Sequence, residues 1–160
     1  VRTLEGHTNY VNSACVTPDG LHVVTASEDR TARVWLLADG SLVRTLEGHT
    51  AVVTCACVTP DGLHVVTASR DKTARVWLLA DGSLVRTLEG HTYMVSSACV
   101  TPDGLHVVTA SGDNTARVWL LVDGSLVRTI EGHTGMVTCA CVTPDGLHVV
   151  TASYDKTARV

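Results

Sequence analysis

Short apolar runs separated by polar turns recur along the whole chain. Near its beginning they cover residues 1–4, 11–16, 21–27 and 31–37, and each is rich in β-branched or small residues. Such runs favour β-strands, and no window shows the 3.6-residue apolar spacing of a helix. The pattern therefore predicts an all-β chain, built as a meander of short antiparallel strands.

Two turn motifs separate these runs. Residues 17–20 read Thr-Pro-Asp-Gly, in which proline presets φ, aspartate can bond its own backbone and glycine accepts a positive φ. Residues 39–40 read Asp-Gly, a strong hairpin signal. Successive turns of an antiparallel meander lie at alternate edges of the sheet. The loop after His7 and the loop around Asp29 are therefore expected together, at the end opposite these two turns.

The whole pattern is an internal repeat. The string VRTLEGHT begins at Val1, Val43 and Val85, and returns as VRTIEGHT at Val127. Its period of 42 residues lies within the roughly 40–45 residues of one four-stranded propeller blade. We expect one domain over residues 1–160, in repeats 1–42, 43–84, 85–126 and 127–160. The last repeat is cut short before its tryptophan, and we expect the chain to be a piece of something longer.

The motifs within one repeat closely resemble the WD40 repeat. They are Gly-His, then Pro-Asp-Gly, then Ser-x-Asp-x-Thr and a tryptophan, which in the first copy are Gly6-His7, Pro18-Asp19-Gly20, Ser27 to Thr31 and Trp35. One departure is that each tryptophan is followed by Leu where the family usually has Asp. The resemblance implies a β-propeller that binds other proteins. The near-identical copies are similar to the amplified WD40 arrays of NACHT-type receptors, and an engineered propeller made from one amplified blade would look the same.

A histidine, an acid and a hydroxyl in each repeat could suggest a hydrolase triad. The set recurs in every copy, whereas an enzyme needs one site, so we predict that the protein is not an enzyme. The resemblance instead implies a structural hydrogen-bond network within each blade. We expect Thr25 rather than Ser27 to be the partner of Trp35. The network residues are His7, Thr25, Asp29, Trp35, His49, Thr67, Asp71, Trp77, His91, Thr109, Asp113 and Trp119; the fourth copy, with His133, Thr151 and Asp155 but no tryptophan, is expected to be less well held.

Composition narrows the classes of partner. The net charge is −4, with acidic and basic residues interspersed, so neither a nucleic acid nor an anionic membrane surface is indicated. No apolar run approaches the roughly 20 residues that span a bilayer, and no secretory signal is visible. We expect a cytoplasmic protein. Its six cysteines all fall at repeat-equivalent positions and are expected to be reduced, small and buried.

Metal binding is the alternative for some of these cysteines. Cys55 and Cys57 would share one face of a strand, as would Cys139 and Cys141, and a histidine such as His64 or His148 could complete a zinc site. The spacing is not that of a zinc finger, and the first cysteine of each pair is serine in the other two copies. We predict no metal and no cofactor, and we expect His22 and its repeats to be exposed.

The copies differ mainly in two short stretches, one after the Gly-His motif and one flanking the structural aspartate. Both are expected at one end of the blades, and they include a charge reversal from Glu28 to Arg70. A constant scaffold with changing loop residues is typical of a binding surface, although exposed loops also vary without function. We predict that a protein or peptide partner contacts Asn9, Tyr10, Asn12, Glu28, Arg30, Val52, Arg70, Lys72, Tyr93, Met94, Asn114, Met136, Tyr154 and Lys156.

The two ends of the repeat array complement each other. Residues 1–4 form a strand signal with no preceding blade, and the last blade, residues 137–160, has no outer strand. The resemblance to WD40 rings implies a closure in which the first strand of the chain completes the last blade. Such a closure leaves no exposed sheet edge. Because four blades are few for this family, we predict a homodimer that forms one eight-bladed ring. A four-bladed monomer and a fragment of a longer array are the alternatives.

Overall fold

The computed structural model describes residues 2–160, and all regular structure in them is β. The strands form antiparallel sheets of consecutive strands, each a blade. The first blade is β1 (Val11–Val16), β2 (His22–Ser27), β3 (Ala32–Leu36) and β4 (Leu42–Leu46). The second is β5 (Val53–Val58), β6 (His64–Ser69), β7 (Ala74–Leu78) and β8 (Leu84–Leu88). The third is β9 (Val95–Val100), β10 (His106–Ser111), β11 (Ala116–Leu120) and β12 (Leu126–Ile130), and the fourth is β13 (Val137–Val142), β14 (Val149–Ser153) and β15 (Ala158–Arg159).

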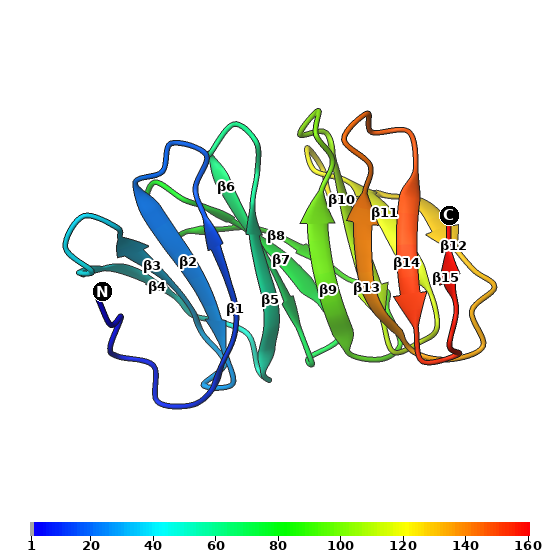
Figure 1. The fold of residues 1–160 in the computed structure, drawn as a ribbon, viewed down its shortest axis with the longest axis horizontal. Coiled ribbons are helices and arrows are strands. Elements are labelled where there is room, and N and C mark those ends of the chain that lie inside the picture. Colours follow the sequence, from blue (N-terminus) through cyan, green and yellow to red (C-terminus); the bar gives the residue numbers. More distant parts are fainter. Residues whose placement is uncertain (1) are drawn as a thin grey trace.

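The blades stand side by side in an open row, with the two chain ends at opposite ends of the row (Figure 1). Strand β1 packs against β5, β5 against β9, and β9 against β13, so the first strand of each sheet is the inner one. The all-β architecture of four-stranded antiparallel blades predicted from the sequence is confirmed.

The prediction of a strand at residues 1–4 is wrong. Residues 2–4 have no sheet partner, and Val1 lies outside the described residues. The equivalent segments in later repeats pair with the sheet before them, as β4, β8 and β12 do. A blade therefore takes its outer strand from the next repeat, and the first copy of this segment has no blade to complete. The other strands begin and end within one residue of the expected positions, except β14, which begins two residues later than the sequence predicts.

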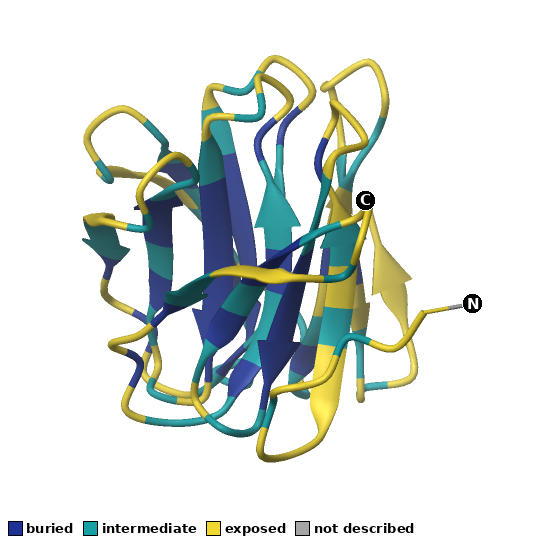
Figure 2. Cartoon of the chain, turned by 90° about the vertical axis from the view of Figure 1, so that its left-hand side faces the viewer, coloured by how far each residue is buried: buried dark blue, intermediate teal, exposed yellow. Residues whose placement is uncertain are grey.

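The hydrophobic core lies between blades. Val24, Val34 and Leu46 of the first blade pack with Val53 and Trp77 of the second, all at most 2% exposed. The same arrangement recurs between the second and third blades. Because both faces of a middle strand are covered, its valines are buried in pairs rather than alternately. In Figure 2 most of the buried segments lie on strands inside the row, and the exposed segments lie in the loops and on outer strands.

Side chains also connect neighbouring blades through hydrogen bonds. The Asn12 amide donates to the carbonyl of Val53 at 3.0 Å. Thr54 and Ser96, at the equivalent position, donate to the first-strand carbonyl of the next blade at 2.7 and 2.6 Å. This column changes between copies but always keeps a donor. Asn12 therefore belongs to the junction between blades, and its sequence variation does not by itself mark a partner contact.

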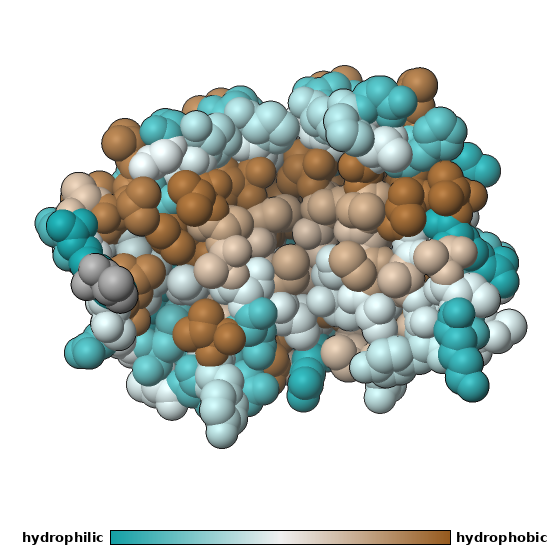
Figure 3. All heavy atoms as spheres, in the orientation of Figure 1, coloured by the Kyte–Doolittle hydropathy of each residue, from teal (hydrophilic) through white to brown (hydrophobic). Residues whose placement is uncertain are grey.

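The two end faces of the row are open. Val11 is 52% exposed, whereas its equivalent Val53 is fully buried against the preceding blade. Cys139 and Cys141 are exposed, although Cys55 and Cys57 pack against the core between the second and third blades. The expectation of six buried cysteines is wrong for the last pair, because no blade covers their face, and the other four are half-buried. In Figure 3 apolar residues form a band that runs along the row of blades, between polar residues at the top and bottom of the view.

Candidate functional site

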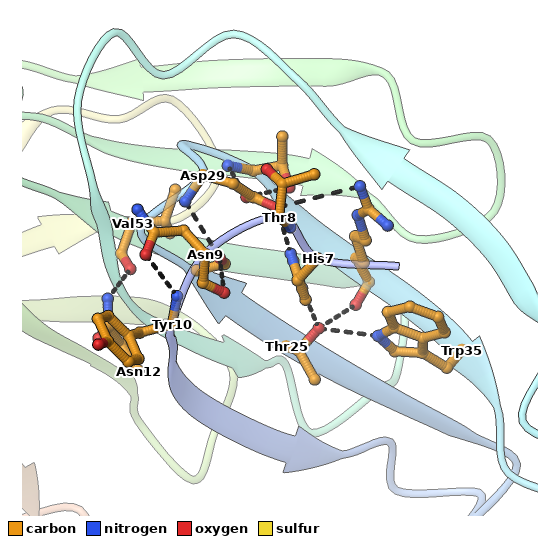
Figure 4. A network of polar contacts seen from close by, with 12 residues as sticks. His7, Thr8, Asn9, Tyr10, Asn12, Thr25, Asp29, Trp35 and Val53 are labelled. Carbon is orange, nitrogen blue, oxygen red and sulfur yellow. Dashed lines mark hydrogen bonds and ion pairs between the residues drawn. The ribbon is translucent and has the colours of Figure 1, made fainter. Parts of the chain in front are cut away.

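Four side chains from three parts of the first repeat meet in one hydrogen-bond network (Figure 4). His7 Nδ1 lies 2.7 Å from Asp29 Oδ2, and His7 Nε2 lies 2.7 Å from Thr25 Oγ1. The indole of Trp35 donates to the same Thr25 oxygen at 2.8 Å. Ser27 bonds elsewhere, to the carbonyl of Asn9.

The direction of each hydrogen bond follows from what each group can donate. An indole N–H can only donate, so Thr25 accepts from Trp35. The hydrogen of Thr25 then points to His7 Nε2 at 2.7 Å in preference to the carbonyl of Arg33, which is 3.5 Å away. His7 is then the neutral tautomer protonated on Nδ1, which donates to Asp29. The chain of bonds leaves the Thr25 hydroxyl engaged on both sides, as a structural group would be.

The aspartate holds the backbone of two loops. Its Oδ1 accepts from the amide of Thr31 at 3.0 Å and the hydroxyl of Thr31 at 2.6 Å, while Oδ2 also accepts from the amide of Thr8 at 3.1 Å. These bonds fix a tight turn in which Arg30 has a φ of 70°, a left-handed conformation that is uncommon for residues other than glycine. The turn geometry is therefore set by Asp29, which leaves the neighbouring side chains free to vary.

The network is the same in the other copies. The His Nδ1–Asp distances are 2.6, 2.7 and 2.6 Å in the second, third and fourth copies. Trp77 and Trp119 donate to Thr67 and Thr109 at 2.8 and 2.9 Å. The fourth copy keeps both histidine bonds without a tryptophan, His133 lying 2.6 Å from Asp155 and 2.9 Å from Thr151. Its His–Thr distance is the longest of the four copies, and Thr151 lacks the indole donor, so the expectation that this copy is less well held stays a prediction.

Burial and hydrogen bonding shift the ionisation of this network. Burial alone would raise the pKa of Asp71, but hydrogen bonds from His49 and Thr73 outweigh it and leave the pKa well below its usual value. Burial lowers the pKa of His91, the positive charge of Arg117 lowers it further, and Asp113 opposes both. In the third copy the fold therefore favours an ionised Asp113 and a neutral His91.

This ionisation predicts a loss of stability on mild acidification. His91 has a folded pKa below its unfolded value of 6.5, so its contribution is complete above that pH and is lost as the pH falls. Thermal unfolding followed between pH 7.5 and 5.5 should show a decreasing midpoint, with a shallower decrease in His91→Gln. The matched variant His148→Gln, at an exposed position, should keep the original slope. Equal slopes in all three proteins would contradict the assignment.

The two variable stretches of each blade are joined by backbone hydrogen bonds. The amide of Glu28 donates to the carbonyl of Tyr10 at 2.9 Å, and the equivalent pairs are Arg70–Val52 at 2.9 Å, Gly112–Met94 at 2.9 Å and Tyr154–Met136 at 3.0 Å. We call this end of the blades the variable face, made by residues 9–10 and 28–30 and their three repeat equivalents. The structure thus brings together all the predicted partner-binding residues except Asn12, which lies at the blade junction.

The predicted contact residues differ in how far they reach from this face. Tyr10, Tyr154 and Tyr93 are 77%, 72% and 56% exposed. The other exposed ones are Asn9, Arg30, Arg70, Lys72 and Lys156, and the half-buried ones are Glu28, Val52, Met94, Asn114 and Met136.

Sequence reasoning missed Gly112, which is the only one of the four equivalent positions without a side chain. Its signal was present in the comparison of copies.

The histidine at the start of the second strand of each blade is more covered than expected in the first three copies. His22, His64 and His106 are half-buried rather than exposed as expected, and only His148 is exposed; the rings of His22 and His64 are partly covered, with Nδ1 buried. Within residues 2–160 no three metal-binding side chains cluster. The same residues include no helix with the length and apolarity needed to cross a membrane.

The repeated blades and their internal networks define a protein of the β-propeller repeat class. The model of the family described as "WD domain, G-beta repeat" matches residues 1–35, 40–77, 82–119 and 124–160. The chain therefore belongs to the WD40 repeat family. Domains of this family generally bind proteins and act as non-catalytic scaffolds.

A curated protein similar to this chain is Lissencephaly-1 homolog 1 of Paramecium tetraurelia, 49% identical over 37 residues. That match covers 23% of this chain and 9% of the relative. It extends over less than one repeat period and leaves most of the relative unmatched.

Proposed function

We propose that this chain is a non-catalytic β-propeller scaffold whose variable face binds a protein or peptide partner. The observation that supports it best is the contrast within each blade: an invariant network holds the backbone while the residues flanking Asp29 and its equivalents change size, charge and polarity. A rigid frame that presents changing side chains is how loop-based binding sites are built. The hydroxyl in each network is buried, at most 5% exposed from Thr25 to Thr109, and this favours a structural role over catalysis.

The test exchanges one copy's face residues for those of another copy. Tyr93→Ala, Met94→Val, Gly112→Arg and Asn114→Lys together give the third copy the residues of the second. Because an equivalent blade already holds these residues, the thermal midpoint should not change. Peptides selected from a random displayed library on the unaltered chain should lose binding to this variant.

The matched control is Val122→Ala, which also converts a third-copy residue to its second-copy equivalent but lies in the turn at the opposite end. It should leave peptide binding unchanged. A library that yields no specific peptide, or peptides that bind both variants equally, would favour the alternative of a self-assembling structural or engineered propeller without a ligand.

We further propose that two chains close one eight-bladed ring. Residues 2–4 already sit where the outer strand of a preceding blade would lie: Arg2 donates to the carbonyl of Leu37 at 3.0 Å, as Arg44 does to Leu79. Leu4 packs near Gly40 as Leu46 packs near Gly82. This segment is therefore positioned to pair with β15 of a second copy, where Leu4 would face Ala158, as Leu46 faces Ala32.

Mass in solution tests the ring. Light scattering should give about twice the 16.9 kDa of one chain, and a monodisperse 16.9 kDa particle would reject the dimer. Closure would also cover Cys139 and Cys141, so both should react slowly with a thiol reagent in the native protein. A dimer in which both thiols react as fast as in the unfolded chain would be associated through another surface.

We also propose a cytoplasmic location for the protein. Its six free cysteines are consistent with that location.

A further inference from the structure

The variable face is not uniform, and its third blade differs from the others. At the position before the structural aspartate, the other copies carry Glu28, Arg70 and Tyr154, whereas the third carries Gly112. The backbone there does not need glycine, because Gly112 is absent from the residues with positive φ. The missing side chain therefore lets neighbouring side chains lie directly over the backbone at this position.

Side chains from two blades lie over Gly112. A Cβ on Gly112 would clash with the ring of Tyr93 and would lie 2.9 Å from the sulfur of Met136. Tyr93 belongs to the loop between β8 and β9, and Met136 to the loop between β12 and β13. An uncharged cluster of one aromatic ring and one thioether thus bridges the third and fourth blades over a bare backbone.

The side chains of this cluster are partly exposed, and hydrogen bonds fix the backbone that carries them. Tyr93 is 56% exposed and Met136 is half-buried. The hydroxyl of Ser111 donates to the carbonyls of Tyr93 and Met94 at 3.1 and 2.9 Å, and the amide of Gly112 donates to Met94 at 2.9 Å. Tyrosine and methionine are enriched in interface cores, and methionine adapts its shape to an apolar guest.

Basic residues lie on the blades to either side. Arg70 and Lys72 are exposed on the second blade and Lys156 on the fourth, and both of these blades pack directly against the third. Asn114, between them, is uncharged. Apart from Glu28 on the first blade, the glutamates on this end, such as Glu89, follow the outer strands and recur in every copy, so they do not distinguish one blade from another.

We infer that the Tyr93–Gly112–Met136 cluster receives an apolar side chain of a peptide segment that carries acidic residues on both sides of it. The inference rests on the proposed binding role of the variable face and assigns its partner a chemistry. The apolar residue enters between Tyr93 and Met136, and the flanking carboxylates lie towards Arg70 on one side and Lys156 on the other. Charge complementarity of this kind sets orientation and speeds association.

A random displayed peptide library, selected on the unaltered chain, provides an unbiased probe. The selected peptides should share an apolar or aromatic residue between Asp or Glu residues. Binding of a representative synthetic peptide should fall about tenfold or more when the cluster is filled, which corresponds to about 1.4 kcal/mol. Two variants, Gly112→Arg and Gly112→Glu, each add a side chain at this position. The second and first copies already hold these residues there, as Arg70 and Glu28.

The two fillings separate shape from charge. Loss of binding in both variants means that the space over Gly112 is needed, since one adds a positive and the other a negative charge. Loss only in Gly112→Glu would mean that charge alone matters and would overturn the apolar anchor.

The flanking charges are tested with residues that other copies also hold. Arg70→Glu with Lys72→Asn, and separately Lys156→Asn, should weaken binding of the same peptide, more so at low salt. The matched control Arg30→Asn removes the same charge at the equivalent turn position of the first blade, which packs against neither the third nor the fourth blade of its own chain, and it should weaken binding less than either of these variants.

The outcomes distinguish this inference from the broader proposal. Selected peptides that are basic, or acidic polymers that bind equally well without an apolar residue, would overturn the inference while leaving a binding face. An absence of specific peptides, or peptides insensitive to the exchange of the whole third-copy face, would overturn the binding face itself.

Discussion

Trp77→Ala is expected to lower the free energy of unfolding by about 3–5 kcal/mol, the usual cost of removing a buried large aromatic side chain. Trp77 is 2% exposed and packs in the core that joins the first and second blades. Its loss would leave a cavity between two blades and free the hydroxyl of Thr67 from its indole donor. Chemical denaturation followed by circular dichroism measures the change.

Trp35→Ala is the matched control for this prediction. Trp35 makes the same hydrogen bond, to Thr25 at 2.8 Å, but no preceding blade packs against the sheet that carries it. In single chains, stabilisation that comes mainly from packing between blades predicts a clearly smaller loss for Trp35→Ala than for Trp77→Ala. In the proposed ring the last blade of the second copy would pack against the sheet that carries Trp35, and the two losses should be similar. The mass by light scattering is therefore measured on the same samples, and equal losses in single chains would place the stabilisation in the hydrogen bond to threonine and contradict the packing argument.

The fold was predictable from the sequence because its information is local and repeated. The Thr-Pro-Asp-Gly and Asp-Gly turns set where the chain reverses, and the period of 42 residues sets where each blade recurs. The strand at residues 1–4 was mispredicted because a strand needs a partner. The same letters at residues 43–46 lie within a strand, since β3 of the preceding blade is there to bond them.

The site was predictable in part. Residues that recur together can be grouped from their spacing, and the antiparallel topology predicts which loops share an end. The sequence could not reveal in which direction each varying side chain points. Asn12 varies between copies as the face residues do, yet its amide points to the carbonyl of Val53 in the next blade. Exposure of Cys139 also depends on the absence of a covering blade, which no local pattern contains.

Asp71→Asn should lower the free energy of unfolding by about 2–3 kcal/mol, because it exchanges an acceptor of several hydrogen bonds for a group that is partly a donor. The carboxylate of Asp71 accepts from the ring of His49, from the amide of Thr50, and from the amide and hydroxyl of Thr73. An asparagine oxygen can replace one carboxylate oxygen, but its NH2 group must then face donors. At least one buried donor is left without a partner.

The dependence of this loss on pH separates the loss of charge from a general disturbance of the turn. The folded pKa of Asp71 lies below its unfolded value, so the ionised carboxylate stabilises the fold fully above about pH 4 and progressively less as the pH falls. Asp71→Asn cannot lose this contribution, so its difference from the unaltered chain should narrow between pH 5 and pH 2.5. A difference that stays constant across that range would show that shape, and not the charge of Asp71, holds the turn beneath the variable face.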